Sequence, residues 1–354
     1  MEKHIFIVAG EASGELYGAL LCRALKKIVP NVHIHGMGGS MMAEEGVRLI
    51  TSISGSHGLI ETFRLLRKLK SDFDLLLKEI KKIRPNVVVL IDYPDFNIPL
   101  LKGIKKLNIP VLYYVSPTVW AWRRNRAKTI AAYADAIALI FPFELDIYRP
   151  LGIKSEFVGH PVLDYHEEIL PERLTKEEAK ESLGSSPDKI TVALMPGSRN
   201  SEIKNLLPLI IGSARELKKR YKNNIEFFMP LVHSIDVSLD EYINIVDRKR
   251  VGEVLSASDV GIIASGTAAL EACFFGTPLV MIYKLSPITF FLAKRLIKVN
   301  YISHVNMIVN REVVPELIQD RANVNNIVMY VDKIIHDEAF RRNMLDAFIK
   351  VREI

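Results

Sequence analysis

The stretch "HIFIVAGEASGELYGALLCRAL", residues 4–25, joins an uninterrupted apolar run to a glycine-rich turn and then to a helical pattern of apolar residues. The run at 4–9 predicts a buried strand, because parallel strands that are covered on both faces are apolar throughout. A strand, a glycine turn and a helix in this order indicate an α/β fold, and such a turn often binds phosphate. Here the glycines lie four residues apart with glutamates between them, which does not match the dinucleotide-binding spacing.

The same alternation of apolar runs and helical patterns continues along the chain. Besides 4–9, the runs that predict strands are 31–35, 87–92, 110–115, 136–141, 156–158, 190–195, 225–229, 259–264 and 278–283. A charged helical stretch and linker at 164–186 interrupts this rhythm. We therefore expect an α/β doubly wound domain at 1–163, a second one at 187–324 and a helical tail at 325–354, with a ligand bound in a cleft between the two domains.

The composition is that of a globular protein, with 49% hydrophobic and 25% charged residues among 354. The net charge of +6 indicates an acidic partner, which could be nucleic acid, anionic lipid or a phosphorylated substrate. Nucleic acid is disfavoured, because the loop at 113–126, with both tryptophans and three arginines, is too narrow for a nucleic-acid surface. Two cysteines exclude a disulfide framework, and no signal peptide or apolar run of transmembrane length is found, so we expect a cytosolic protein.

The strongest candidate for a phosphate site follows the predicted strand at 259–264. Ser265 is a favourable N-cap for the next helix, and Gly266 and Thr267 leave backbone N–H groups available to a diphosphate. Glu271, about one and a half turns later, is placed to accept hydrogen bonds from the hydroxyl groups of a ribose. The alternative is an ordinary N-capped helix with a half-exposed glutamate.

Two further charged residues follow predicted strands and are candidate catalytic groups. Arg199 lies in the turn "MPGSRNSE", where its guanidinium could hold phosphate oxygens in a bidentate fork, although a surface charge is the alternative. Asp95 follows the strand "VVVLID" in the loop "YPDFN", and it is a candidate general base provided that it is buried. Capping of the helix that starts near Asn97 would explain Asp95 equally well.

The segment at 58–70, "GLIETFRLLRKLK", has the pattern of a basic amphipathic helix. It places four apolar side chains near one face: Leu59, Ile60, Phe63 and Leu66. Such a helix can lie in the headgroup layer of a membrane, and core packing is the alternative. No metal site is predicted, because His33 and His35 alternate on one strand without further ligands.

Seven short motifs occur in this chain in a fixed order. They are "AGEASGE", "IDYPDFN", "YYVSPTVWAWR", "VGHP", "MPGSR", "ASGTAALEA" and "NREVVPELIQ", and they extend from residue 4 to about residue 320. None is specific alone, but the ordered set resembles the lipid A disaccharide synthase family. The resemblance implies the GT-B fold, with two Rossmann-like doubly wound domains facing across a cleft. It also implies an inverting transferase that needs no metal ion and no cofactor.

By resemblance, the donor is UDP-2,3-diacylglucosamine and the acceptor is 2,3-diacylglucosamine 1-phosphate (lipid X). The products are UDP and a β-1,6-linked disaccharide 1-phosphate for lipid A. Inversion requires a base for the acceptor hydroxyl and positive groups for the leaving diphosphate. We assign Asp95 as the base, Arg199 and the helix start at 265–267 as the groups that hold the diphosphate, and Glu271 as the ribose ligand.

Further substrate contacts are expected in both domains. In the first domain, Ser13 and Gly14 are small enough for the backbone to approach a bulky ligand. Glu15 is a third candidate catalytic group: it would hydrogen-bond sugar hydroxyls or position the acceptor near Asp95, and it could be the base in place of Asp95. In the second domain, the donor side would be lined by Asn306, Glu316 and Gln319.

Acylated substrates favour membrane contact by the segment at 58–70 and a peripheral location on the cytoplasmic face of the inner membrane, whose anionic headgroups match the net positive charge. One alternative is another UDP-sugar GT-B enzyme, either a peptidoglycan-type N-acetylglucosaminyltransferase or a UDP-sugar 2-epimerase. The amphipathic segment and the tryptophan-rich loop argue against the epimerase. The other alternative is a membrane-surface binding protein without turnover. The residues leave the oligomeric state open, a homodimer included.

Overall fold

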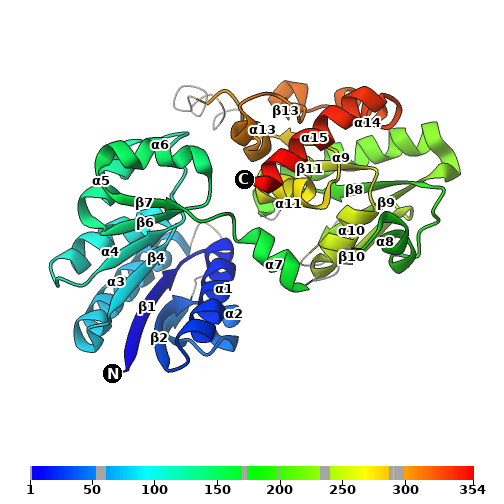
Figure 1. Ribbon diagram of the computed structural model, residues 1–354. Helices are drawn as coiled ribbons and strands as arrows, with labels where there is room; N and C mark the ends of the chain where they lie inside the picture. The colour runs from blue at the N-terminus through cyan, green and yellow to red at the C-terminus, as the bar shows by residue number, and fades with distance from the viewer. Residues whose placement is uncertain are drawn as a thin grey trace. The chain divides into compact units, whose positions relative to one another are not determined.

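The chain divides into two compact units, Met1–Asp164 and Tyr165–Ile354. A computed structural model describes residues 2–52, 61–169, 174–197, 199–231, 240–286, 290 and 299–354, except for the side chains of 61–66, 169, 200 and 201. Both units are layered α/β structures (Figure 1). Each is built on its own parallel sheet.

The sheet of the first unit has seven described strands in the order β3-β2-β1-β4-β5-β6-β7, all parallel. They are β1 (Lys3–Ala9), β2 (Val32–Gly38), β3 (Arg48–Ser52), β4 (Val87–Ile91), β5 (Val111–Tyr114), β6 (Ala136–Leu139) and β7 (Lys154–Phe157). The strand order reverses between β1 and β4, as in doubly wound sheets, and ligands bind outside the carboxyl ends of strands at such a point.

Helices cover both faces of this sheet (Figure 1). They are α1 (Ala12–Ile28), α2 (Ser40–Glu44), α3 (Glu61–Ile83), α4 (Pro94–Lys105), α5 (Asn125–Tyr133) and α6 (Leu145–Tyr148), with 3-10 turns at Pro142–Glu144 and Arg149–Leu151. Helix α7 (Val162–Ile169) begins at the end of this unit and continues into the second. Phe6 and Val8 of β1 pack in one core cluster with Leu76 of α3 and Leu100 of α4, while Ile7 between them is also fully buried. Burial on both faces explains the uninterrupted apolar run at the start of the chain.

The sheet of the second unit has six described parallel strands in the order β10-β9-β8-β11-β12-β13. They are β8 (Ile190–Met195), β9 (Ile225–Leu231), β10 (Ile243–Asp247), β11 (Val260–Ala264), β12 (Leu279–Tyr283) and β13 (Glu316–Ile318). The helices are α8 (Lys176–Ser182), α9 (Asn200–Tyr221), α10 (Val251–Ala257), α11 (Thr267–Phe275), α13 (His304–Val309), α14 (Val324–His336) and α15 (Glu338–Glu353), with 3-10 turns at Lys222–Asn224, Arg248–Arg250 and Gln319–Arg321. The order again reverses in the middle, here between β8 and β11.

The predicted α/β doubly wound architecture is confirmed, and each of the ten predicted strands corresponds to an observed one. Strands β3, β10 and β13 were not predicted, and all three lie at sheet edges. Edge strands cover less of the core, so β3 and β10 carry exposed residues and lack a continuous apolar run. The three residues of β13 are too few for a pattern.

The helical tail at 325–354 forms most of α14 and all of α15, which pack on the second unit. Met344 and Phe348 of α15 are fully buried, and the backbone N–H of Leu279 on β12 lies 3.3 Å from the sulfur of Met344. The stretch at 164–186 contributes to α7 and α8, and from Tyr165 onward it belongs to the second unit.

Candidate active site

The first candidate site lies at the carboxyl ends of β1 and β4, where the turn after Ala9 and the loop after Ile91 are neighbours. Gly10 opens the turn, and a Cβ at this position would lie 2.0 Å from Cδ1 of Tyr93. The Tyr93 ring fills this space and stacks on Phe96, with the ring centroids 5.6 Å apart. The absence of a side chain at Gly10 is therefore explained by packing against Tyr93.

Two buried polar side chains hold the loop after β4 in its conformation. Asp92 has a left-handed backbone with φ of 41°, which is strained for a residue with a Cβ. The Nδ2 of Asn97 donates to the carbonyl oxygens of Ile91 (3.1 Å) and Asp92 (2.9 Å), and the hydroxyl of Tyr113 donates to the latter at 2.7 Å. These bonds satisfy the carbonyls and fix the start of α4, which carries Asp95.

Asp95 lies in the first turn of α4, and its side chain is 76% exposed. Its carboxylate forms ion pairs with Arg126 and with Nη1 of Arg123, the latter at 3.4 Å. The guanidinium of Arg123 lies 4.3 Å from the ring centroid of Trp122. Together the arginine and the tryptophan form an aromatic and cationic surface beside the carboxylate. The prediction that Asp95 lies in a loop is wrong, because α4 begins at Pro94. The burial that a base role was expected to require is absent, because this side chain points to solvent while Phe96 and Asn97 are buried. The role of Asp95 as a base stays a prediction.

The residues predicted in the first turn of α1 have packing and capping roles in the structure. Ser13 is exposed, whereas Gly14 is buried, and a Cβ there would lie 3.6 Å from the side chain of Ile91. Glu15 points to the start of α2, where its Oε1 accepts a hydrogen bond from the backbone N–H of Met41 at 2.8 Å. A carboxylate is favourable at this helix end. Substrate contacts of these residues stay predictions.

The second candidate site lies at the carboxyl ends of β8 and β11, which are neighbours with Met195 in register with Ile263. Gly266 is the N-cap of α11, with φ of 139°, and no side chain caps this helix. The prediction of Ser265 as the cap is wrong, because the chain enters α11 through a conformation that favours glycine. Apart from its two chain neighbours, no described residue has an atom within 4 Å of where a Cβ on Gly266 would stand. The amino end of α11, from Thr267, is therefore suited to an anion.

Arg199 is the N-cap residue of α9, and its side chain is 72% exposed. Its Nη1 lies 3.2 Å from Oε1 of Glu202, and its backbone N–H donates to the other oxygen of the same carboxylate at 3.3 Å. Glu202, which was not predicted, packs over Gly197, where a Cβ would lie 2.5 Å from its Oε2. This glutamate orients an arginine at the carboxyl end of β8.

Glu271 of α11 is the centre of a buried ionic cluster. Its Oε1 lies 2.9 Å from Nε2 of His166 on α7, and both of its oxygens accept hydrogen bonds from Nη2 of Arg248, at 2.9 and 2.7 Å. Burial raises the pKa of Glu271, but the charge of Arg248 and the hydrogen bond from His166 outweigh burial and lower this pKa to about 2. Both carboxylate oxygens have protein partners, and the ribose contact stays a prediction.

The three residues implied on the donor side hold backbone segments together. Asn306 is fully buried; its oxygen accepts hydrogen bonds from two backbone N–H groups at 2.9 Å, and its nitrogen donates to Glu316 at 2.8 Å. Glu316 accepts from two further backbone N–H groups, at 2.9 and 3.0 Å. Gln319 pairs with the backbone N–H and C=O of Leu285, at 2.7 and 3.2 Å. These side chains fix the loops of the second unit, and their contact with a donor stays a prediction.

The sequence matches the lipid-A-disaccharide synthetase family over residues 5–352. The chain belongs to this family. The lipid-A-disaccharide synthase of Syntrophus aciditrophicus is 37% identical over 361 residues, which cover 99% of this chain and 93% of that protein. The protein of the same name from Geobacter sulfurreducens is 38% identical, with 99% and 92% covered. The resemblance seen in the ordered motifs is thereby confirmed.

Solved structures of more distant proteins share the fold of this lipid-A-disaccharide synthetase family member. The UDP-GlcNAc 2-epimerase from Neisseria meningitidis, bound to UDP-GlcNAc, has a TM-score of 0.65 at 13% identity, covering 100% of this chain and 99% of that one. Spinosyn forosaminyltransferase has a TM-score of 0.60 at 13% identity, with 99% and 95% covered. Identities this low establish the fold alone, which is the GT-B fold.

The described residues bear on two expectations, membrane contact and the absence of a metal site. In the ranges that the structure describes, no helix is long and apolar enough to cross a bilayer. Among the same residues, no group of three or more His, Cys, Asp or Glu side chains is arranged to hold a metal ion. Leu59 and Ile60 lie outside the described residues, and Phe63 and Leu66 lie where α3 is described without side chains. Their membrane contact stays a prediction.

Proposed function

We propose that this protein is the inverting glycosyltransferase that joins UDP-2,3-diacylglucosamine to 2,3-diacylglucosamine 1-phosphate. The products are UDP and the β-1,6-linked disaccharide 1-phosphate that leads to lipid A. The match to the lipid-A-disaccharide synthetase family over residues 5–352 carries this proposal. The two switch points, one in each unit, support it because each gathers polar side chains at the strand ends where ligands of such sheets bind.

The second unit is the proposed donor side. The leaving UDP develops negative charge on its diphosphate, and fixed positive groups lower the barrier to its departure. Arg199 and the backbone N–H groups at the start of α11 follow neighbouring strands, and they supply this positive charge without a metal ion. We assign Glu271 to the uridine ribose, either directly or by holding Arg248 beside it.

The first unit is the proposed acceptor side. Asp95 would take the proton of the acceptor's 6-hydroxyl as its oxygen bonds to C1 of the donor sugar, while the bond from C1 to the UDP oxygen breaks. The carboxylate lacks the burial that the assignment from the sequence required, so the proposal rests on its place after β4 and on Arg126 and Arg123, which orient it. Trp122 and the arginine over it form a face that suits a sugar ring and a phosphate group.

Kinetics of Asp95→Asn test the assignment of the base. Loss of a general base should lower kcat for disaccharide formation by about 100-fold to 10,000-fold with little change in KM. Asp146→Asn is a matched control, because Asp146 is also an exposed aspartate in the first turn of a helix of the first unit. A rise in acceptor KM with unchanged kcat would mean that Asp95 only orients the arginines, and it would refute the assignment.

Membrane contact by the segment at 58–70 is proposed from its basic amphipathic pattern and from the acyl chains of both substrates. Simultaneous serine substitutions would remove the apolar face at four positions: Leu59, Ile60, Phe63 and Leu66. Co-sedimentation with vesicles that contain anionic lipid should then fall, while circular dichroism stays unchanged. Equal co-sedimentation of the variant and the unmodified protein would contradict the proposal, together with the peripheral location on the cytoplasmic face that rests on it.

A further inference from the structure

A cavity of about 470 Å³ lies at the amino-terminal edge of the second sheet. Ile190 at the start of β8, Asp259 before β11 and Pro278 before β12 all line it. In a parallel sheet these strand starts lie at the edge opposite to the strand ends that carry Arg199 and Gly266. The cavity is therefore separate from the proposed sugar-transfer site. Its volume falls in the range of small-molecule pockets.

Part of the cavity lining is apolar. It is formed by side chains from α10, α11, α14 and α15 and from the segments before α8 and β12: Leu174, Leu255, Phe275, Pro278, Ile335 and Leu345. Burying a hydrocarbon chain against these apolar side chains is favourable, because it removes apolar surface from water.

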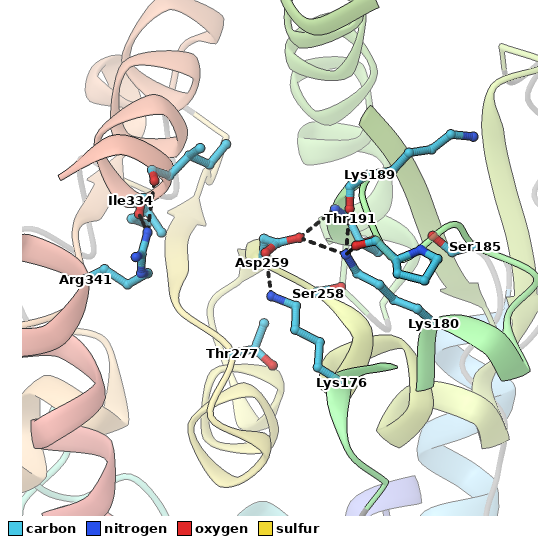
Figure 2. Close-up of polar contacts among 12 residues, drawn as sticks. Lys176, Lys180, Ser185, Lys189, Thr191, Ser258, Asp259, Thr277, Ile334 and Arg341 are labelled. Atoms are coloured by element: carbon cyan, nitrogen blue, oxygen red, sulfur yellow. Dashed lines mark hydrogen bonds and ion pairs between the residues drawn. The ribbon is translucent and has the colours of Figure 1, made fainter. Parts of the chain in front are cut away.

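The polar wall is centred on Asp259, whose carboxylate is already engaged by the protein (Figure 2). One oxygen pairs with Lys176, and the other accepts from the backbone N–H of Thr191 at 2.9 Å and lies 3.7 Å from Nζ of Lys180. Lys180 is buried and also donates to two backbone carbonyls, at 2.9 and 2.6 Å. Lys176 remains 40% exposed at the cavity.

Arg341 of α15 supplies a further positive charge. Its Nη1 donates to the carbonyl oxygens of Ile334 and Ile335, at 3.1 and 2.9 Å, where α14 ends (Figure 2). Its other guanidinium nitrogens make no hydrogen bond within the described part of the chain. Among the charged residues that line the cavity, Lys176 and Arg341 outnumber Asp259, which leaves a net charge of +1. Lys180, which does not line the cavity, lies against the same carboxylate.

We propose that this cavity binds a small amphipathic anion with a single hydrocarbon chain. The carboxylate or phosphate head lies against Lys176 and Arg341, and the chain lies on the apolar part of the lining. An anion matches the net positive charge, and a guanidinium with free N–H groups recognises carboxylate and phosphate equally well. A free fatty acid and a singly alkylated phosphate share this chemistry. The site is independent of the sugar-transfer reaction.

Calorimetric titration of the full-length protein tests the proposal, with laurate, dodecyl phosphate, dodecanol and acetate as probes. Laurate and dodecyl phosphate are used below their critical micelle concentrations, and dodecanol is used below its solubility limit. We expect laurate or dodecyl phosphate to bind, and dodecanol and acetate to bind at least 10-fold more weakly. The stronger of the two anions identifies the head group. Equal binding of dodecanol would overturn the charge assignment, and absence of binding by both anions would overturn the site.

Two variants and one control show where the probes bind. They are needed because the proposed sites for the acyl chains of the substrates could also bind these probes. Ser256→Phe places an aromatic ring in the cavity, and it should lower the laurate stoichiometry by one. Lys176→Met keeps the length of the chain and should weaken binding about 5-fold to 10-fold, whereas Lys219→Met, on an exposed part of α9, should not. Binding that is unchanged in Lys176→Met would refute the proposal even if Ser256→Phe did not fold. Sugar-transfer kinetics should be the same in all three variants.

Discussion

Replacing Glu271 by glutamine should destabilise the second unit by an amount that depends on pH. The carboxylate is 4% exposed and contacts both His166 and Arg248. Glutamine has a similar shape but removes the charge that faces Arg248. The guanidinium would then lose its counter-ion, and its Nη1 is already buried without a hydrogen-bond partner among the described residues. The substitution therefore leaves a partly buried charge uncompensated.

The size of the pH-dependent effect follows from the pKa of Glu271, which falls from 4.5 to about 2 on folding. A lowered pKa stabilises the folded state above the unfolded value, and the stabilisation is lost as the pH falls toward the folded value. Linkage gives about 3 kcal/mol at pH 7 and about 2 kcal/mol at pH 3.5. The destabilisation by Glu271→Gln should thus shrink by roughly 1 kcal/mol between these two pH values.

Urea unfolding of both proteins between pH 3.5 and pH 7 measures this difference. Glu216→Gln is the control, because Glu216 forms an exposed pair with Lys219 on the same unit, worth at most about 1 kcal/mol. If the gap between Glu271→Gln and the unmodified protein stayed constant with pH, or widened toward acid, the assignment of Glu271 as a buried anion in this cluster would be wrong.

Substitutions at three further positions have defined outcomes. Gly266→Ala should cost about 1–3 kcal/mol of unfolding free energy in urea titrations, because φ is 139° although no atom would clash with the added Cβ. Arg199→Ala should lower kcat/KM for disaccharide formation by about 100-fold and Arg199→Lys by less, if the guanidinium holds the leaving diphosphate. Burial raises the pKa of Glu144 to about 8, so the stability that its neutral form provides is lost as the pH rises from about 4.5 to 8. The melting temperature of Glu144→Gln should therefore fall less between pH 5 and pH 8 than that of the unmodified protein. An equal change of melting temperature with pH in the two proteins would argue against a buried neutral carboxyl.

The sequence was sufficient to predict the layers of the fold, because strands buried on both faces need continuous apolar runs. It also placed Arg199 and Asp95 correctly after their strands, since strand ends in a parallel sheet meet at one edge. Exposure was not predictable: α4 begins at Pro94 instead of near Asn97, so Asp95 lies in its first turn with an exposed side chain and not in a loop.

Contacts between distant parts of the chain were beyond reach of a single sequence. Glu271 and His166 are separated by 105 positions, and no local pattern indicates that they meet. Glu202 is different, because a glutamate three residues after Arg199 at a helix start has capping-box spacing. That signal was available and could have identified the partner of the arginine.

Product analysis of the purified protein tests the central claim most directly. The protein is incubated with UDP-2,3-diacylglucosamine and 2,3-diacylglucosamine 1-phosphate, with and without EDTA, and the products are identified by mass spectrometry and by the anomeric coupling in proton NMR. We predict equal amounts of UDP and of a β-1,6-linked disaccharide 1-phosphate, unaffected by the chelator. UDP release without disaccharide, an α-linked product or epimerisation of a UDP-sugar would contradict the account.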